Sequence, residues 1–407
     1  MQLFKQHEIT SYWIAANKIP LGRNPDNPEK IIFKILPRIS DSLIISASPG
    51  RGKSVIFRLL NWFISQIRPT IMFDWEGEDH KLSYYPNSKP INLPPYIRPS
   101  PIPRALFFSY PSPSTVAEDK EKYEEQVIPN LNDYNSDELR GMGFPVGSAM
   151  ELKRILKQYG EFKDLMEVYE FIKAFPTNER ESKTSYKDRE EKKKYVNLGD
   201  SIPSQTKQSL LKYLYSIIEK NLFCLTYDKM PFYIDLLKRR YNLFLNFNGF
   251  VDLARVEISK RLSEIIKLRK KDPDGVAPAV FYEEADRIIP RYIIDSEEKK
   301  KVEYVLSEIV NASLRARKLR VAQYFNTPSL SNLHRIIVDN SNEKIFGEMS
   351  GFDLMEVKRC TDEFVMNMVT SLKFNRYRNI REFVFRNEFK NTFKFIPFEC
   401  PQELHRE

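Results

Sequence analysis

The most constraining feature of the sequence is a short glycine-containing segment that follows an apolar run at residues 43–46. The segment is Ala47-Ser48-Pro49-Gly50-Arg51-Gly52-Lys53-Ser54, and helical character begins at Val55. A short buried strand, a turn containing glycine and a helix opened by Lys-Ser are the setting of a phosphate-binding loop. The pattern therefore predicts a strand–loop–helix unit that binds a nucleotide.

The residue types in this loop suit phosphate binding. Gly50 and Gly52 allow close approach of the backbone, and N–H groups of the turn and of the helix N-terminus would surround a phosphate. Lys53 would reach the β- and γ-phosphates of ATP, and the Ser54 hydroxyl would hold Mg²⁺. We assign nucleotide binding to Ser48, Pro49, Gly50, Arg51, Gly52, Lys53, Ser54 and Val55. The alternative is a glycine turn that matches the pattern by chance, with Ala47 at the position of the first glycine.

Composition narrows the class of protein. The chain has 407 residues, of which 42% are hydrophobic, and a net charge of +9. This net charge suits a polyanionic partner such as nucleic acid. A basic surface without such a partner would give the same net charge. The three cysteines and four histidines have no metal-site spacing, no apolar stretch reaches about 18 residues, and no signal peptide is evident. We therefore expect a cytoplasmic protein, in the host cytoplasm if it is encoded by a virus or plasmid.

Strands and helices alternate along much of the chain, which predicts an α/β fold with a mainly parallel sheet. Strands are predicted at 31–36, 43–46, 70–73, 106–110, 243–247, 279–282, 321–325, 343–346 and 382–386, and helices between them at 54–67, 251–269, 298–317 and 329–337. Further helices are predicted at 115–128, 148–158, 162–174, 204–219 and 230–239, around a charge-dense run at 178–197. The expected units are a lead-in (1–40), the first part of the core (41–111), a mainly helical insertion (112–240), the second part of the core (241–386) and a tail (387–407).

A pair of carboxylates follows the apolar run at 279–282. Glu283 would position Mg²⁺, and Glu284 would act on the attacking water as a base. The alternative is an ordinary strand-to-helix junction, where the helix dipole favours acidic residues.

Two further positions have chemistry that suits nucleotide hydrolysis. Asn326, after the strand at 321–325, would sense the γ-phosphate through its amide, or it belongs to a simple Asn-Thr-Pro turn. Arg317, with Arg315 as second choice, would complete the site of a neighbouring subunit and stabilise transition-state charge. The alternative for these arginines is a basic helix end that interacts with its own dipole.

Taken together, the motifs resemble the HerA/FtsK superfamily of ring-forming P-loop ATPases over about residues 40–350. Besides the phosphate loop, the matching segments are Phe73-Asp74-Trp75-Glu76-Gly77-Glu78, Val280-Phe281-Tyr282-Glu283-Glu284-Ala285-Asp286, Arg317-Lys318 with the strand ending Asn326-Thr327-Pro328-Ser329, and Asn340-Ser341-Asn342-Glu343-Lys344-Ile345. Three positions depart from the family pattern, because Glu283 replaces Asp, Asp286 replaces His and Asn326 replaces Gln.

The resemblance implies a RecA-like P-loop NTPase core of the ASCE type, with helices flanking the sheet and a helical insertion. It also implies ATP and Mg²⁺ as cofactors and a homohexameric ring with double-stranded DNA in its pore. In that arrangement Glu284, Lys53, Asn326 and Arg317 would be catalytic, and Ser54 and Glu283 would bind the metal. The basic stretches at 267–271 and 239–240 would contact DNA phosphates, or they are solvated loop charges.

The sequence therefore favours an ATP-dependent DNA translocase or packaging motor, which would act with a nuclease, a portal or a secretion partner. Two alternatives remain open. One is a conjugation or secretion ATPase that acts on a protein or nucleoprotein, with the insertion as its partner-binding surface. The other is a nucleotide-gated assembly protein with weak hydrolysis.

Overall fold

The computed structural model describes residues 18–35, 41–74, 104–111, 125–160, 162–177, 201–225, 232–293, 296–349, 351–375 and 380–398. Three expectations lie outside these residues. They are the Trp75-Glu76-Gly77-Glu78 part of the second motif, most of the helix predicted at 115–128, and the charged run at 178–197. Of the helices in the described part of the chain, none is long and apolar enough to cross a membrane.

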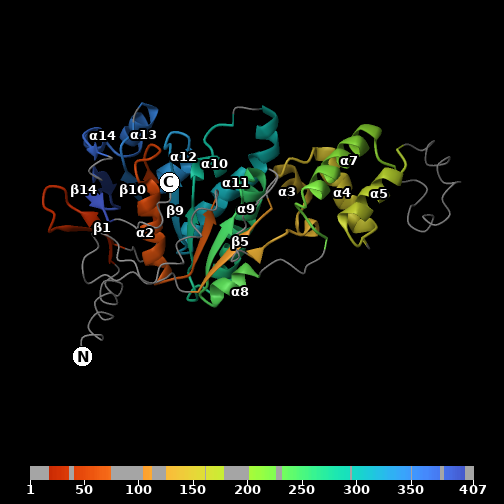
Figure 1. The fold of residues 1–407 in the computed structure, drawn as a ribbon, viewed down its shortest axis with the longest axis horizontal. Coiled ribbons are helices and arrows are strands. Elements are labelled where there is room, and N and C mark those ends of the chain that lie inside the picture. Colours follow the sequence, from red (N-terminus) through yellow and green to blue (C-terminus); the bar gives the residue numbers. More distant parts are fainter. Residues whose placement is uncertain are drawn as a thin grey trace.

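The described residues form a sheet of twelve strands, and its parallel part holds the phosphate loop (Figure 1). In spatial order the parallel strands are β10 (Glu343–Phe346), β3 (Ser42–Ser46), β9 (Ala322–Thr327), β8 (Ala279–Tyr282), β4 (Thr70–Asp74), β7 (Asn242–Asn246), β5 (Ala105–Ser109) and β6 (Glu125–Gln126). Strand β9 separates β3 from β8, as in the ASCE type of P-loop NTPase. The predicted fold class, α/β with a mainly parallel sheet, is confirmed.

An antiparallel group of strands extends the sheet beyond β10. It consists of β13 (Phe383–Arg386), β14 (Thr392–Pro397), β1 (Lys18–Arg23) and β2 (Ile31–Ile35), each antiparallel to its neighbour. Part of the segment designated as a C-terminal tail is therefore a sheet strand, and the N-terminal lead-in supplies two more. A separate short pair, β11 (Phe374–Asn375) and β12 (Ile380–Arg381), precedes β13.

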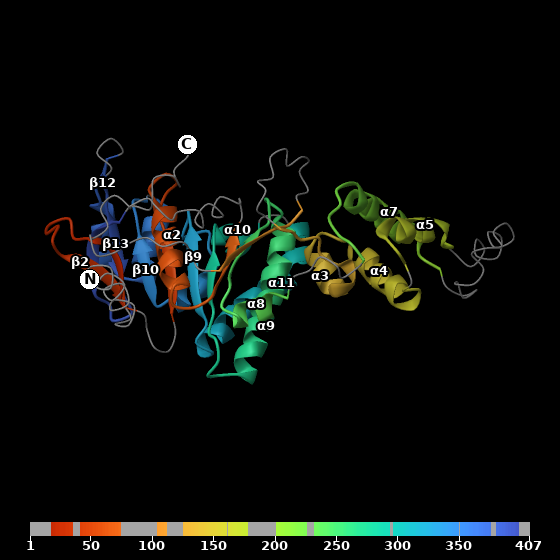
Figure 2. The same ribbon diagram turned by 60° about the horizontal axis from the view of Figure 1, so that its bottom comes forward.

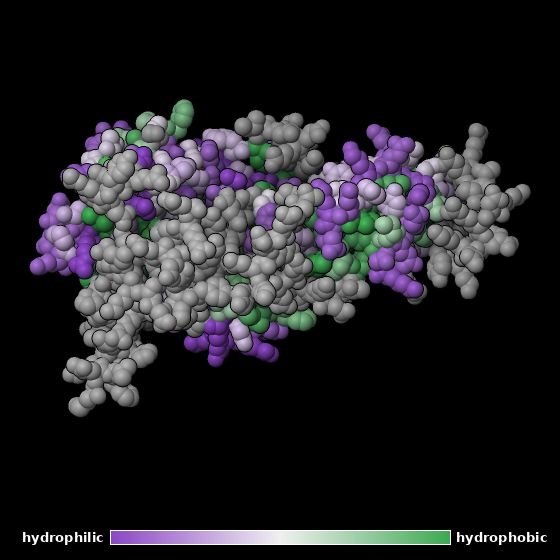
Figure 3. Space-filling view, in the orientation of Figure 1, coloured by the Kyte–Doolittle hydropathy of each residue, from purple (hydrophilic) through white to green (hydrophobic). Residues whose placement is uncertain are grey.

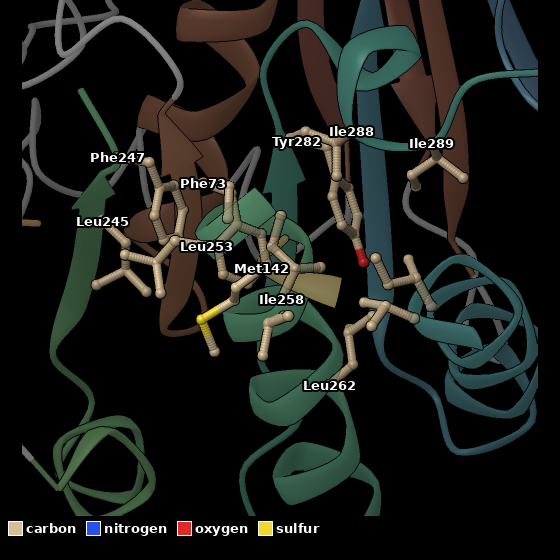
Figure 4. Close-up of a cluster of buried hydrophobic side chains, with 14 of the residues drawn as sticks. Phe73, Met142, Leu245, Phe247, Leu253, Ile258, Leu262, Tyr282, Ile288 and Ile289 are labelled. Atoms are coloured by element: carbon tan, nitrogen blue, oxygen red, sulfur yellow. The ribbon is translucent and has the colours of Figure 1, made fainter. Parts of the chain in front are cut away.

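Successive side chains of each strand point to opposite faces of the sheet, and they contribute to two separate hydrophobic cores. On β3, Leu43 and Ile45 face the core under helix α2 (Lys53–Ser65), whereas Ile44 faces the opposite core. Helices α9 (Val251–Lys271) and α11 (Ser296–Lys318) pack against each other in that second core. Figure 4 shows Leu253 and Leu262 of α9 directed toward the sheet. The parallel sheet is thus covered on both faces, which explains why both faces of β3, β4 and β8 are buried.

The helical insertion lies between β6 and β7 and projects at the end of the molecule opposite the antiparallel strands (Figures 1 and 2). Its helices are α3 (Ser136–Gly141), α4 (Val146–Gln158), α5 (Leu165–Ala174), α7 (Ser204–Glu219) and α8 (Tyr233–Lys238). Helices α4, α5 and α7 form the projecting end (Figure 1), whereas α8 packs against α9 and β7 of the core. The prediction of a helix at 115–128 is wrong at its described end, because Glu125–Gln126 pairs with β5 as β6.

Buried Glu257 of α9 joins the insertion to the core. Tyr134 and Tyr110 both donate hydrogen bonds to its carboxylate, and Arg261 lies 3.3 Å from it. Although burial opposes ionisation, Arg261 and the two hydroxyl donors hold the pKa of Glu257 below its ordinary value. The insertion is therefore fastened by a charged network as well as by apolar contacts.

The remaining helices lie in the connections before and after β10. Helix α12 (Arg335–Asn340) is shorter than the helix predicted at 329–337, and it begins later because Thr327 and Ser329 form a hydrogen-bonded turn before it. Helices α13 (Phe352–Cys360) and α14 (Glu363–Thr370) follow β10 and were not predicted. They carry the chain from β10 back to the antiparallel strands.

Candidate nucleotide site

The phosphate loop connects β3 to α2 with two glycines in the left-handed region. Gly50 has φ of 75° and Gly52 has φ of 90°, which favour glycine at both positions. An added Cβ at Gly50 would meet no atom within 4 Å, so this part of the loop borders open space. The backbone conformation of the loop is thus one that the predicted glycines permit.

The N-terminus of α2 is prepared for an anion. Its N-cap residue, Gly52, provides no side-chain hydrogen bond, and the first turn holds no acidic residue. The N–H groups of the first turn and the positive end of the helix dipole therefore lack a compensating carboxylate of their own. Lys53 and Ser54 are the first two residues of the helix, where they would meet a phosphate group.

Strand β8 places Glu283 and Glu284 directly after its last residue. Glu283 is largely buried, and its N–H donates to the carbonyl of Phe73 on β4 at 3.1 Å. Glu284 has φ of 44° and ψ of 51°, an uncommon backbone conformation for a residue with a side chain. One oxygen of the Glu284 carboxylate lies 2.7 Å from Nε of Arg287, so the two side chains form an ion pair.

Asn326 lies inside β9, between the strands that carry the phosphate loop and the glutamates. It pairs with Ile45 of β3, and the register of β9 with β8 places it level with Glu283. The residue is fully buried, and neither the oxygen nor the nitrogen of its amide has a hydrogen-bond partner. Leaving such a group unpaired costs about 1 to 3 kcal/mol. A polar ligand at the end of β9 would relieve this cost, which suits the predicted role better than a simple turn does.

Asp286, at the position where the family has His, is also part of this edge. The Thr327 hydroxyl donates to its carboxylate at 2.8 Å. Burial raises the pKa of Asp286 above its ordinary value, and the hydrogen bond from Thr327 and the charge of Lys53 counteract the rise only in part.

Arg317 lies away from this cluster. It is near the C-terminus of α11, before β9 begins, and its guanidinium donates to the carbonyl of Asn340 at 3.1 Å. Arg315 is on the same helix and is exposed. The structure therefore brings Lys53, Ser54, Glu283, Glu284 and Asn326 to one edge of the sheet, which we call the nucleotide edge. It places Arg317 toward the opposite edge.

The two basic stretches predicted to contact DNA also lie toward that opposite edge. Residues 267–271 belong to the last turns of α9 and are not a loop. Arg269 is 3% exposed and donates to the carbonyls of Leu319 and Gly275, so its assignment to DNA contact is wrong. Exposed cations near the ends of α8, α9 and α11, before β7, β8 and β9 begin, are Arg239, Arg240, Lys267, Lys270, Lys271, Arg315, Lys318 and Arg320, which we call the basic edge. Figure 3 shows hydrophilic surface around α8 at the bottom of the view.

Sequence reasoning missed the residues after β10 that contact the phosphate loop. The N–H of Ser48 donates to the carbonyl of Glu348 at 3.0 Å, and the Glu348 carboxylate lies 3.2 Å from Arg51. An added Cβ at Gly347 would lie 2.7 Å from Cβ of Ala47, so only glycine allows this approach. A glycine directly after an apolar strand was the available signal.

The strand order, the phosphate loop and the glutamates after β8 define a P-loop NTPase fold. Among solved structures, the chain is similar to VirB4 of Thermoanaerobacter pseudethanolicus, with a TM-score of 0.55, 13% sequence identity, and coverage of 95% of this chain and 98% of that chain. It is also similar to the plasmid coupling protein TrwB in complex with a non-hydrolysable ATP analogue, with a TM-score of 0.53, 10% identity, and coverage of 88% and 85%. No family model and no curated protein sequence matches the chain.

Proposed function

We propose that this chain is an ATP-dependent motor of the HerA/FtsK type that moves double-stranded DNA in the cytoplasm by hydrolysing ATP between the subunits of a ring. One observation carries the ATPase part of the proposal. The phosphate loop, Glu283 and Glu284, and the unpartnered amide of Asn326 converge on one edge of the sheet. Structural roles alone do not explain a buried amide without a partner at that position.

The residues of this edge would have different roles in hydrolysis. Lys53 and the N–H groups of α2 would bind the phosphates, and the Asn326 amide would hold the attacking water near the γ-phosphate. Glu284 would accept the proton of that water, while Arg287 pairs with one of its two oxygens. Ser54 and Glu283 would hold Mg²⁺, which supplies charge stabilisation when bound.

A ring would explain the position of Arg317 and the surface of α13 and α14. Arg317 is remote from the nucleotide edge of its own subunit, so it would act on a neighbour. Phe352 and Met355 of α13 and Phe364 of α14 are more than 60% exposed, and α13 begins shortly after Glu348, which contacts the phosphate loop. Hydrophobic atoms protrude over α13 at the top of Figure 3. A neighbouring subunit that covers these side chains would lie beside the bound nucleotide.

The basic edge supports DNA as the polyanion. Its exposed lysines and arginines gather where α8, α9 and α11 end, away from the nucleotide. Contacts from such side chains to phosphates do not depend on base sequence and weaken as salt displaces them.

A second candidate function is a conjugation or secretion ATPase that acts on a protein or nucleoprotein. The observation that favours it is the apolar surface of the insertion, where Val146 and Met150 of α4, Met166 of α5 and Tyr215 of α7 are each about half exposed, from 47% to 59%. Such side chains on a projecting helical unit suit a protein partner.

Steady-state ATPase activity, measured with and without linear double-stranded DNA at two salt concentrations, tests the proposal. The DNA motor predicts strong stimulation that weakens with salt, and loss of turnover in Lys53→Ala and Glu284→Gln. Glu284→Gln should still bind ATP. Activity indifferent to DNA would favour the conjugation or secretion ATPase, and slow turnover coupled to nucleotide-dependent oligomerisation would favour the assembly protein.

Mixing inactive variants tests the role of Arg317. If Arg317 acts on a neighbour, mixtures of Arg317→Ala and Glu284→Gln subunits should recover part of the activity, because some sites then contain both groups. Arg335→Ala, which removes an exposed arginine paired with Asp339, is the matched control and should leave activity unchanged. Absence of recovery at every ratio would remove Arg317 from this role, and Arg315→Ala would be tested next.

A further inference from the structure

Arg381 of β12 lies over the phosphate loop although it is far from the loop in the sequence. An ideal Cβ added at Gly52 would be 3.0 Å from Cδ of Arg381 and 3.1 Å from its Nη1. Gly52 is the residue before Lys53 and the N-cap of α2. The guanidinium of Arg381 is therefore next to the loop residues that would surround the phosphates.

Neighbours on the C-terminal side of Arg381 hold it in this position. Glu382 is largely buried, its N–H donates to the carbonyl of Lys373, and its carboxylate accepts from the N–H of Lys373 at 2.9 Å. Phe383 is fully buried, and its ring lies 2.6 Å from an ideal Cβ at Gly347, the glycine that also contacts Ala47. The chain at 381–383 is thus fixed against the loop by both polar and apolar contacts.

Within the described residues, the charge of Arg381 is not paired with a carboxylate. Its Nε is buried without a hydrogen-bond partner, and no described carboxylate forms an ion pair with it. By contrast, Arg51 of the loop is paired with Glu348 at 3.2 Å, and Arg386 at the end of β13 is paired with Asp362 at 2.9 Å. A guanidinium at the positive end of a helix, beside Lys53, is repelled unless an anion lies between these groups. An arginine held without a partner in this place indicates that the anion is a ligand.

We propose that Arg381 binds the β-phosphate side of the nucleotide within its own subunit, as a second cation beside Lys53. The proposal rests on the proposed nucleotide site and adds a residue that no loop motif contains. The planar guanidinium would donate two parallel hydrogen bonds to phosphate oxygens, which is the geometry that distinguishes arginine from lysine. Because the contact is to the diphosphate part, it strengthens ADP and ATP binding alike.

Direct binding measurements by calorimetry with ADP, a non-hydrolysable ATP analogue and pyrophosphate test this inference without hydrolysis or DNA. Arg381→Gln is expected to weaken all three by about 10- to 100-fold, the effect of losing a charged hydrogen bond. Arg381→Lys keeps the charge and should bind with intermediate affinity. Arg386→Gln removes a paired arginine from the neighbouring strand and should bind like the wild type.

The outcomes separate this inference from the proposed function. Wild-type affinity of Arg381→Gln for ADP and pyrophosphate would overturn it, and so would weaker binding of ADP with unchanged binding of pyrophosphate, because the contact would then be to the nucleoside. Normal nucleotide binding by Lys53→Ala would instead contradict the proposed nucleotide site. Action within one subunit further predicts that mixing Arg381→Gln with Glu284→Gln subunits recovers less activity than mixing Arg317→Ala with them. The unliganded melting temperature of each variant shows whether it is folded.

Discussion

The two ends of the same central strands differ in how their buried polar groups are paired. Where β3 and β10 begin, Lys34 lies between Asp41 and Glu343, and Tyr324 of β9 donates to Asp41. Where β3 and β9 end, the Asn326 amide and the Ser46 hydroxyl are buried without partners. Both ends are polar, but the buried polar groups have partners at one end only. This difference supports a structural network at the first end and our proposal of a ligand site at the second.

The network at the beginning of the strands is charged and closed to water. Lys34 is fully buried and its Nζ lies 2.7 Å from Asp41. Burial lowers the pKa of Lys34, but the two carboxylates outweigh it and raise the pKa overall. Burial and the charge of Asp41 raise the pKa of Glu343 to about 7, against the opposing effect of Lys34. A single cation is shared by two carboxylates, so removing Lys34 leaves both carboxylates buried without a compensating charge.

The largest expected effect concerns the charged network where β3 and β10 begin. Lys34→Met should lower the free energy of unfolding by about 3 to 5 kcal/mol, because it leaves Asp41 and Glu343 buried without a cation. Chemical denaturation measures the loss, which should shrink at acidic pH as the carboxylates protonate. The triple variant Lys34→Met, Asp41→Asn, Glu343→Gln should recover much of the stability. ATPase activity per folded molecule should stay unchanged, and its loss would contradict the separation of the two ends.

The second effect distinguishes a ligand group from a structural one on a single strand. Asn326→Leu should lower turnover by about 100-fold or more and raise the free energy of unfolding by about 1 kcal/mol, because an unpaired buried amide is removed. Gln323, also buried in β9, accepts from Tyr282 and donates to the carbonyl of Ser313. Gln323→Leu should therefore destabilise the protein and spare turnover per folded molecule. The same pattern in both variants would show that Asn326 is structural.

A third, smaller effect is the pH dependence of the network. Since the folded-state pKa of Glu343, about 7, exceeds the ordinary value of 4.5, this group takes up a proton on folding between those pH values. It therefore contributes stability that falls as pH rises from about 4.5 to 7. Glu343→Gln cannot ionise, so its melting temperature relative to the wild type should increase across this window. A constant difference would show that Glu343 keeps its ordinary pKa.

The smallest effect concerns Asp286 at the nucleotide edge. Because its pKa is raised in the folded state, ionisation of Asp286 lowers stability progressively as pH rises from its ordinary pKa through the raised pKa. Asp286→Asn keeps the acceptor for Thr327 and should raise the melting temperature at neutral pH by about 1 to 2 °C. The advantage should disappear in acid, where the wild-type carboxyl is protonated. Thermal scans at several pH values measure it, and a lower melting temperature at neutral pH would show that the carboxylate is stabilised by Lys53.

Several features of the nucleotide edge could be predicted from local sequence pattern alone. The glycines and Lys-Ser of the loop, the apolar runs of β3 and β8, and the glutamates after β8 are all contiguous in sequence. Their backbone conformation depends on near neighbours, and parallel strands bring their carboxyl ends to one edge. These features, together with the mainly parallel sheet, were therefore predictable from the sequence.

Tertiary structure decided the features that depend on pairing between distant segments. No local pattern places β14 and β1 side by side or buries Lys34 between Asp41 and Glu343. Residues in α9 show the same limit, since Arg269 looks like a free cation in sequence and donates to carbonyls of distant loops in the fold. Arg381 looks like any surface arginine until Glu382 and Phe383 fix it over Gly52. Sequence determined which groups are available along the chain, and long-range packing decided which of them remain unpaired and face the nucleotide edge, because pairing and burial are properties of the whole fold.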